Sequence, residues 1–251
     1  LGDVLQKVSY DQIYDEHVYL FNCSAVQDVF KKYGLELFDC KRLNTHGGSM
    51  RYYLKKTTSI QISENLSKQI EKEGMMGIKD INTYEEFSQN CEFAKREFKN
   101  SLEIFKEKNN RIVGYGATSK STTILNYCDV GDDLIDFFVD TTPIKQNTYT
   151  PGKHIPVLPY SAFVPHPEVA VLFAWNHKQE IMNKEKDFGG KWITHLFEEF
   201  SKSGAESFID KVFRTDMTRL IVDDPVKRVD NMTMAWGLEA RVPFMDTELV
   251  E

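Results

Sequence analysis

The stretch "RIVGYGATSKSTTILNYC", residues 111–128, decides the fold class. A short apolar run enters a turn that contains Gly114 and Gly116, and the residues after the turn have the pattern of a helix. Such a unit points backbone N–H groups at the helix N-terminus toward a phosphate. The match to a dinucleotide fingerprint is partial, because Ser119 replaces its third glycine. Taken alone, the stretch fits a phosphate-binding turn and a turn that binds nothing equally well.

Strand and helix signals alternate beyond this unit. The expected strands are "LIDFFVD" (134–140), "VAVLFAW" (169–175) and "KWITHLF" (191–197), with a helix in "QEIMNKEKDFGG" (179–190). This alternation predicts a Rossmann-like α/β fold, a parallel sheet flanked by helices, over residues 63–197. Asp140 ends the second strand, where it can accept a ribose hydroxyl, and a long polar loop (138–157) runs on from it. Lys120 can add a positive charge beside the glycine turn.

Other patterns surround this core. Residues 63–110 read as helical, with a capping box of Thr83 and Glu86 and an apolar stripe at spacings of three and four: Phe87, Cys91, Ala94, Phe98, Leu102 and Phe105. Residues 1–62 read as a small β-rich segment, with the runs "HVYLF" (17–21), "LELFDC" (35–40) and "MRYYLKK" (50–56). Residues 198–251 read as a short helical tail.

Composition excludes some classes of function. The chain has 251 residues, 41% of them hydrophobic and 27% charged, which is typical of a globular protein. Its net charge of −7 argues against non-specific binding to nucleic acid or to an anionic membrane. The four cysteines form no C-x-x-C pair, which indicates buried thiols of a cytoplasmic protein and predicts no metal site. The first residue is not Met, so we expect a piece of a longer protein.

The stretch "DQIYDEHVYLFN", residues 11–22, concentrates ionisable side chains. Histidine suits a general base near neutral pH, and Tyr14 and Glu16 can orient His17 or donate to an oxyanion. An extended strand would place His17 on the opposite face from the other two, so a turn would be needed to bring them together. By pattern alone, a strand edge with a solvated histidine is the better interpretation.

The glycine pair in "NTHGGSMR", residues 44–51, indicates a hairpin turn. Its polar side chains are candidate ligand contacts: Asn44, His46, Ser49 and Arg51. Alone, a turn with solvated side chains is again the better interpretation.

Five pieces of the sequence, taken in order, resemble the C-terminal half of the sugar C-methyltransferases. They are "DQIYDEHVYLF", "GLELFDCKRLNTHGGSMRYYL", "VGYGATSKSTTILNYC", "FVDTTPIKQNTYTPGKHIPVL" and "LFAWNHKQEI". Those enzymes depend on S-adenosylmethionine and act on nucleotide-linked keto-deoxysugars. The resemblance covers residues 11–195 and implies a catalytic cluster of Tyr14, Glu16 and His17, with His17 as the base that removes a proton next to the ketone.

The resemblance also implies a nucleotide-diphosphate sugar as the ligand. The residues expected to bind it are Asn44, His46, Ser49, Arg51, Gly114, Gly116, Ser119, Lys120, Asp140 and Lys145. Family members carry a zinc-binding domain and a methyltransferase domain, with its own S-adenosylmethionine loop, ahead of the matching region. Neither precedes residue 11 here, so we expect this chain alone to bind the sugar nucleotide without methylating it.

The tail has a different resemblance. Residues 208–251 resemble asparagine synthetase-type amidotransferases, without the pyrophosphate loop of that family. Two unrelated pieces indicate a chimera with a junction near residues 196–204. The expected domains are therefore 1–62, 63–197 and 198–251. Two alternative functions stay open: a fragment of an ATP-dependent amidotransferase, and a non-catalytic module that binds sugar nucleotides.

Overall fold

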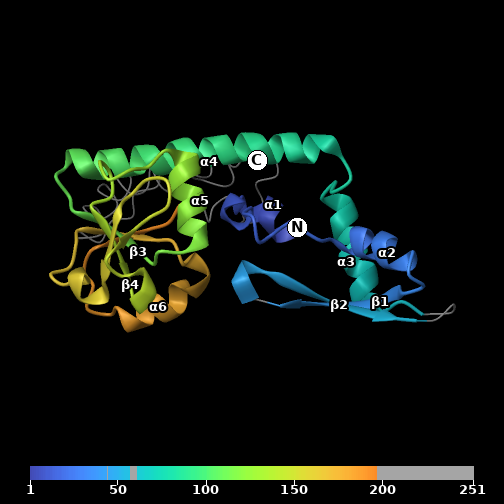
Figure 1. The fold of residues 1–251 in the computed structure, drawn as a ribbon. Helices are drawn as coiled ribbons and strands as arrows, with labels where there is room; N and C mark the ends of the chain where they lie inside the picture. Colours follow the sequence, from blue (N-terminus) through green and yellow to red (C-terminus); the bar gives the residue numbers. More distant parts are fainter. Residues whose placement is uncertain (44, 57–60, 197–251) are drawn as a thin grey trace, which may run out of the picture. The chain divides into compact units, whose positions relative to one another are not determined.

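The structure is a computed structural model that describes residues 1–43, 45–56 and 61–196 (Figure 1). Residues 1–196 form one compact unit. The expected helical tail, with its resemblance to amidotransferases, lies outside the described residues, and so does Asn44.

The larger of the two described sheets in this unit has six strands and is mostly parallel. Its order is β5-β6-β4-β3-β7-β8, and only the edge strand β5 is antiparallel to its neighbour. The strands are β3 (Ile112–Tyr115), β4 (Phe137–Asp140), β5 (Thr148–Tyr149), β6 (Pro156–Pro159), β7 (Val169–Leu172) and β8 (Lys191–Ile193). The predicted mixed α/β fold with a mostly parallel sheet is confirmed. Two strands were not expected, because β5 and β6 lie largely within the segment that reads as a polar loop.

The strand order fixes where a ligand crevice can lie. From β3 the chain builds outward through β4 and β6, and it then returns to the other side of β3 to form β7 and β8. The order therefore reverses between β3 and β7. In open α/β sheets, ligands bind outside the carboxyl ends of the strands at this switch point.

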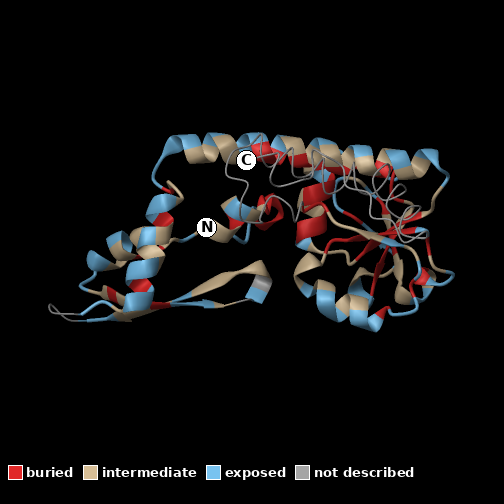
Figure 2. Cartoon of the chain, turned by 180° about the vertical axis from the view of Figure 1, so that it is seen from behind, coloured by how far each residue is buried: buried red, intermediate tan, exposed pale blue. Residues whose placement is uncertain are grey.

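Helices cover both faces of the sheet. On one face, Phe98 of α4 (Ile81–Glu107) meets Phe173, whose ring stacks on Phe138 of β4 with centroids 5.0 Å apart. On the other face, α6 (Lys178–Lys184) packs through Ile181 against a core of Val113, Tyr115, Val139, Phe163, Ala170, Leu172 and Phe188. Figure 2 shows the buried residues concentrated in the sheet and in α5 (Ser119–Cys128).

The long helix begins earlier than the sequence predicts. Asp80 caps α4, accepting a hydrogen bond from Asn82 N at 3.0 Å, so the predicted capping box of Thr83 and Glu86 is wrong. Thr83 instead donates to the Gly77 carbonyl oxygen at 2.8 Å, which holds the turn ahead of the helix. The apolar stripe is correct at its centre, where Cys91, Ala94, Phe98 and Leu102 are buried.

Residues 1–62, predicted to be β-rich, also contain the helices α1 (Gly2–Lys7) and α2 (Cys23–Lys31), whereas α3 (Glu64–Met75) lies in the segment predicted to be helical. The two later β-like runs form an antiparallel hairpin of β1 (Glu36–Leu43) and β2 (Ser49–Lys55), with a short 3-10 helix, η2 (Thr45–Gly47), at its tip. The three α-helices surround it. The predicted strand at 17–21 is wrong. Val18 and Tyr19 are 72% and 75% exposed, and among the described residues the hairpin sheet has no third strand to pair with them.

All four cysteines are buried, and none forms a disulfide bond, as the sequence indicates. Among the described residues, no group of three or more His, Cys, Asp and Glu side chains is arranged to hold a metal ion. None of the helices described here is both long and apolar enough to cross a membrane.

Candidate active site at the carboxyl edge of the sheet

Two loops meet at the switch point. The loop after β3 carries Gly116 and Thr118, and Thr118 caps α5 through a reciprocal pair of hydrogen bonds with Ser121. The loop after β7 forms the 3-10 helix η5 (Trp175–His177). Lys120 joins them: its Nζ lies 3.3 Å from the Asn176 Oδ1 and 4.7 Å from the Trp175 ring centroid. Burial lowers the pKa of Lys120, and the charge of Asp11 opposes that shift.

Asp11 connects the N-terminal segment to these loops. It lies in the 3-10 helix η1 (Tyr10–Gln12) and is 0% exposed. Trp175 Nε1 donates to Asp11 Oδ2 at 2.7 Å, and Lys120 Nζ lies 4.0 Å from the same oxygen. His195 Nε2 lies 3.2 Å from Asp11 Oδ1, within ion-pair distance but poorly aligned for a hydrogen bond. Burial tends to raise the pKa of Asp11, but the three neighbours outweigh it and the net shift is downward.

Aromatic packing fixes η1 from the other side. The Tyr10 ring lies 5.0 Å from the Tyr127 ring and 5.5 Å from the His195 ring, centroid to centroid. The Tyr10 hydroxyl lies 3.2 Å from the Cys128 sulfur. Burial and the neighbouring Cys128 raise the pKa of Tyr10, so its hydroxyl stays protonated. The turn that carries Asp11 is therefore held against α5 on both sides.

The proposed base lies directly after this anchored turn. Tyr14 and His17 face each other, with the Tyr14 hydroxyl 3.1 Å from His17 Nε2, and His17 Nδ1 lies 2.7 Å from the Gln12 carbonyl oxygen. The backbone turns between them, because His17 N donates to the Tyr14 carbonyl oxygen at 2.8 Å. The expectation of a plain strand edge is thus wrong, and the turn that convergence requires is present. Glu16 is exposed and acts on Tyr14 by charge: burial and Glu16 both raise the pKa of Tyr14.

The hairpin tip also reaches the switch point. Gly47 has φ +82 and lies against the Trp175 ring, where any Cβ would clash. Lys7 Nζ donates to the Gly47 carbonyl oxygen. A positive φ and this close approach both favour glycine, which gives the "GG" signal a physical cause. The side chain of His46, in the same tip, is outside the described residues.

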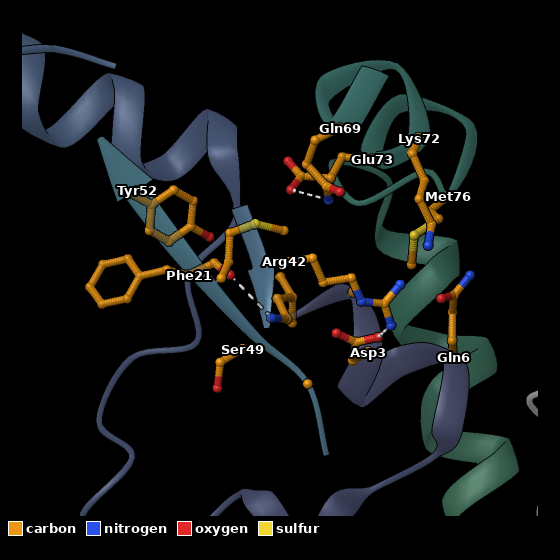
Figure 3. A pocket seen from close by; sticks show the side chains of 14 residues that line it. Asp3, Gln6, Phe21, Arg42, Ser49, Tyr52, Gln69, Lys72, Glu73 and Met76 are labelled. Carbon is orange, nitrogen blue, oxygen red and sulfur yellow. Dashed lines mark hydrogen bonds and ion pairs between the residues drawn. The ribbon is translucent and has the colours of Figure 1, made fainter. Parts of the chain in front are cut away.

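Beside the hairpin lies a pocket of about 260 Å³, formed by residues of α1, β1, β2 and α3 (Figure 3). Arg42 pairs with Asp3 there, and Ser49 lines the wall. The carboxylate of Glu73 closes one side, accepting hydrogen bonds from Cys23 N at 2.9 and 3.1 Å. The exposed Arg51 does not line this pocket.

The glycine turn is occupied by its own chain. Asp140 Oδ2 accepts from Ala117 N at 2.9 Å and Oδ1 accepts from Thr142 N at 2.7 Å. Lys145 Nζ lies 3.5 Å from Asp140 Oδ2 and donates to the Ala117 carbonyl oxygen at 2.7 Å. Burial tends to raise the pKa of Asp140, but the bonds from Thr142 and Ala117 and the charge of Lys145 give a net downward shift. The ribose-binding position of a dinucleotide fold is therefore already bonded to the turn itself.

The two glycines of this turn have different positions. Gly114 is buried within β3, where a Cβ would come within 2.6 Å of the Phe138 ring. Gly116 makes the turn itself, with φ +88. Ser119 is exposed in the first turn of α5.

The predicted residues thus form two groups. Lys120 lies at the switch point, and Tyr14 and His17 follow the η1 turn that is bound to it, whereas Asp140 and Lys145 close the neighbouring loop. The sequence did not single out four residues at the switch point: Asp11, Trp175, Asn176 and His195. It also gave no signal for Arg42 and Glu73, which line the pocket beside the hairpin. Asp11 and Trp175 do stand in the quoted pieces "DQIYDEHVYLF" and "LFAWNHKQEI", but no pattern pairs residues 164 positions apart.

Residues 44–196 match the model of the family described as the C-methyltransferase C-terminal domain. One curated relative is the C-methyltransferase NovU from Streptomyces niveus, 28% identical over 201 residues. That alignment covers 78% of this chain and 48% of the relative, so the chain spans about half the length of the protein it matches.

Proposed function

Because the chain belongs to the C-methyltransferase C-terminal domain family, we propose that it binds a nucleotide-linked keto-sugar and supplies the base for carbon deprotonation. The observation that carries the proposal is the pairing of His17 with Tyr14 directly after the η1 turn, whose Asp11 binds Trp175 at the switch point of the sheet. An extended strand would place His17 and Tyr14 on opposite faces, so their pairing requires a turn between them. The hydrophobic pattern of the sequence does not predict that turn.

The chemistry follows from the two side chains. His17 Nε2 takes the proton from the carbon next to the ketone, a carbon that is acidic because the resulting charge moves onto the ketone oxygen. The raised pKa of Tyr14 keeps its hydroxyl protonated at neutral pH, so once the substrate takes its place at Nε2 the hydroxyl can donate to that developing oxyanion. Glu16, two residues from Tyr14, stays a predicted member of this cluster.

In the family's reaction S-adenosylmethionine supplies the methyl group. The described glycine turn does not fit that cofactor, because both oxygens of Asp140 already accept backbone N–H groups. The residues of this chain therefore take the reaction as far as the carbanion.

The sugar nucleotide would lie along the same edge. Lys120, and the exposed first turn of α5 at Ser119, favour an anionic group. The pocket with Arg42 and Ser49 is slightly smaller than the usual volumes of ligand sites, which suits one ring of the ligand rather than all of it. Asn44, His46 and Arg51 stay predicted contacts, and Gly114, Gly116, Asp140 and Lys145 would act by shaping the turn.

Titration calorimetry with this chain tests the binding step. We expect a deoxythymidine diphosphate keto-sugar to bind, and S-adenosylmethionine and ATP not to bind. Binding of ATP alone would contradict the proposal and favour the amidotransferase alternative.

A deuterium-exchange experiment tests the chemical step without any methyl donor. In D₂O, the chain should speed the exchange of the proton next to the ketone of the bound sugar, followed by proton NMR. The control for a substitution of His17 is His154→Asn. It removes an exposed histidine that is far in sequence from the cluster, and Asn tolerates the φ of 53 at position 154. Binding without exchange would contradict the catalytic role and leave a binding module.

A further inference from the structure

The hydrogen bond at His17 Nδ1 identifies which ring nitrogen is basic. Nδ1 lies 2.7 Å from the Gln12 carbonyl oxygen, and a carbonyl can only accept. Nδ1 must therefore carry the proton, which leaves the lone pair of the neutral ring on Nε2, the nitrogen that faces the Tyr14 hydroxyl. Free histidine in water favours the opposite tautomer, so the protein has to impose this one.

The Gln12 carbonyl is part of the anchored turn. Gln12 N donates to the Ser9 carbonyl oxygen at 3.0 Å and Ile13 N to that of Tyr10 at 2.9 Å, so η1 is closed by its own backbone. Asp11, the central residue of η1, is held by the Trp175 indole N–H at 2.7 Å. A displacement of this turn moves the carbonyl that orients the histidine.

Asp11 cannot take part in the chemistry directly. Its side chain is 0% exposed, and its oxygens face Trp175, Lys120 and His195. A group without solvent access has no path to a substrate, so any effect on the reaction has to pass through another residue.

We propose that Asp11, held by Trp175, is a positioning residue that keeps the Gln12 carbonyl against His17 Nδ1 and so makes Nε2 the base. This inference rests on the proposed function, in which His17 is the base. It adds a residue pair that joins the carboxyl end of β7 to the acid–base cluster.

The test reads the tautomer of His17 directly. Long-range ¹H–¹⁵N spectra of the labelled chain distinguish a protonated Nδ1 from a protonated Nε2, and loss of one ring signal set in His17→Gln assigns the residue. In the wild-type chain at a pH where the ring is neutral, we expect Nδ1–H to dominate. A dominant Nε2–H form would overturn the proposal at once.

Variants then separate positioning from plain stabilisation. Trp175→Phe removes the N–H donor from a half-buried ring and should raise the ratio of Nε2–H to Nδ1–H at least threefold. Asp11→Asn keeps an oxygen that can accept the indole N–H, so this single variant should keep the wild-type ratio. Trp175→Met removes the same donor with a flexible apolar side chain, and it decides the question if Trp175→Phe does not fold.

The matched control removes a hydrogen bond elsewhere in the core. Tyr160→Phe deletes the bond from the Tyr160 hydroxyl to Glu185, at 2.7 Å, and should leave the His17 ratio unchanged. An unchanged ratio in the Trp175 variants, or an equal change in Tyr160→Phe, would show that the Asp11–Trp175 bond has only a structural role. No ligand is present in these spectra, so a failure of sugar-nucleotide binding or of deuterium exchange would leave their outcome readable.

Discussion

Two buried carboxylates at the same edge of the sheet have different roles. Asp140 bonds to residues near it in the chain, the N–H groups of Ala117 and Thr142, and so closes one loop. Asp11 bonds to Trp175 across 164 positions and so joins the N-terminal segment to the end of β7. The acid at the end of a strand, Asp140, is the one that a sequence pattern singles out, and here it bonds to the residues nearer to it in the chain. The acid that assembles the candidate site carries no such signal.

The largest difference between the two should be in stability. Asp11→Ala leaves Lys120 and His195 buried without their acidic partner, and should lower the free energy of unfolding by about 3–5 kcal/mol. Urea unfolding followed by circular dichroism measures this. A loss below about 1 kcal/mol would mean that the N-terminal turn does not depend on Asp11.

The second expectation concerns Gly114, which the sequence links to phosphate binding. Gly114→Ala places a Cβ against the Phe138 ring inside the sheet, an overpacking that costs about 1–3 kcal/mol. Thermal unfolding measures it, with Gly189→Ala as control, because a Cβ there has no neighbour within 4 Å. Equal effects of the two substitutions would contradict the assigned packing role of Gly114.

Asp140→Ala should have a smaller effect than Asp11→Ala. It removes the acceptor of two backbone N–H groups at a loop where water can replace it in part, a loss of about 1–2 kcal/mol. The same urea unfolding measures it. A loss larger than that of Asp11→Ala would reverse the comparison between the two carboxylates.

The smallest effect should be on pH dependence. The pKa of Asp11 is lowered in the folded chain, so its contribution to stability is complete above the unfolded pKa of about 4 and is lost as the pH falls through the lower folded value. The stability difference between wild type and Asp11→Asn should therefore shrink below about pH 4. If this stability difference grew on acidification, folding would raise the pKa of Asp11 instead of lowering it.

Much of the fold could be predicted from the sequence, because its signals are local. The runs that became β3 and β7 are continuously apolar, since both faces of their sheet are covered, and the stripe of α4 repeats at helical spacing. The strand predicted at 17–21 failed for the opposite reason. Its residues have β-like chemistry, but strand formation depends on a partner strand that no local pattern reveals.

The candidate site was only half visible from the sequence. Tyr14 and His17 were candidates, but their convergence depends on a turn whose position is set by the buried Asp11. That burial is a tertiary property, produced when α5 and η5 close over η1. Charged residues are seldom fully buried unless paired, so Asp11 read as a surface acid until its partners were known.

The most direct test of the central claim compares His17→Gln with His154→Asn in the deuterium-exchange experiment. Removing a positioned general base should slow exchange next to the ketone by roughly 10²–10⁴-fold. His154→Asn, which removes an exposed histidine outside the cluster, should stay within about threefold of wild type once the sugar nucleotide is saturating. Equal exchange rates in wild type and His17→Gln would contradict the assignment of His17 as the base.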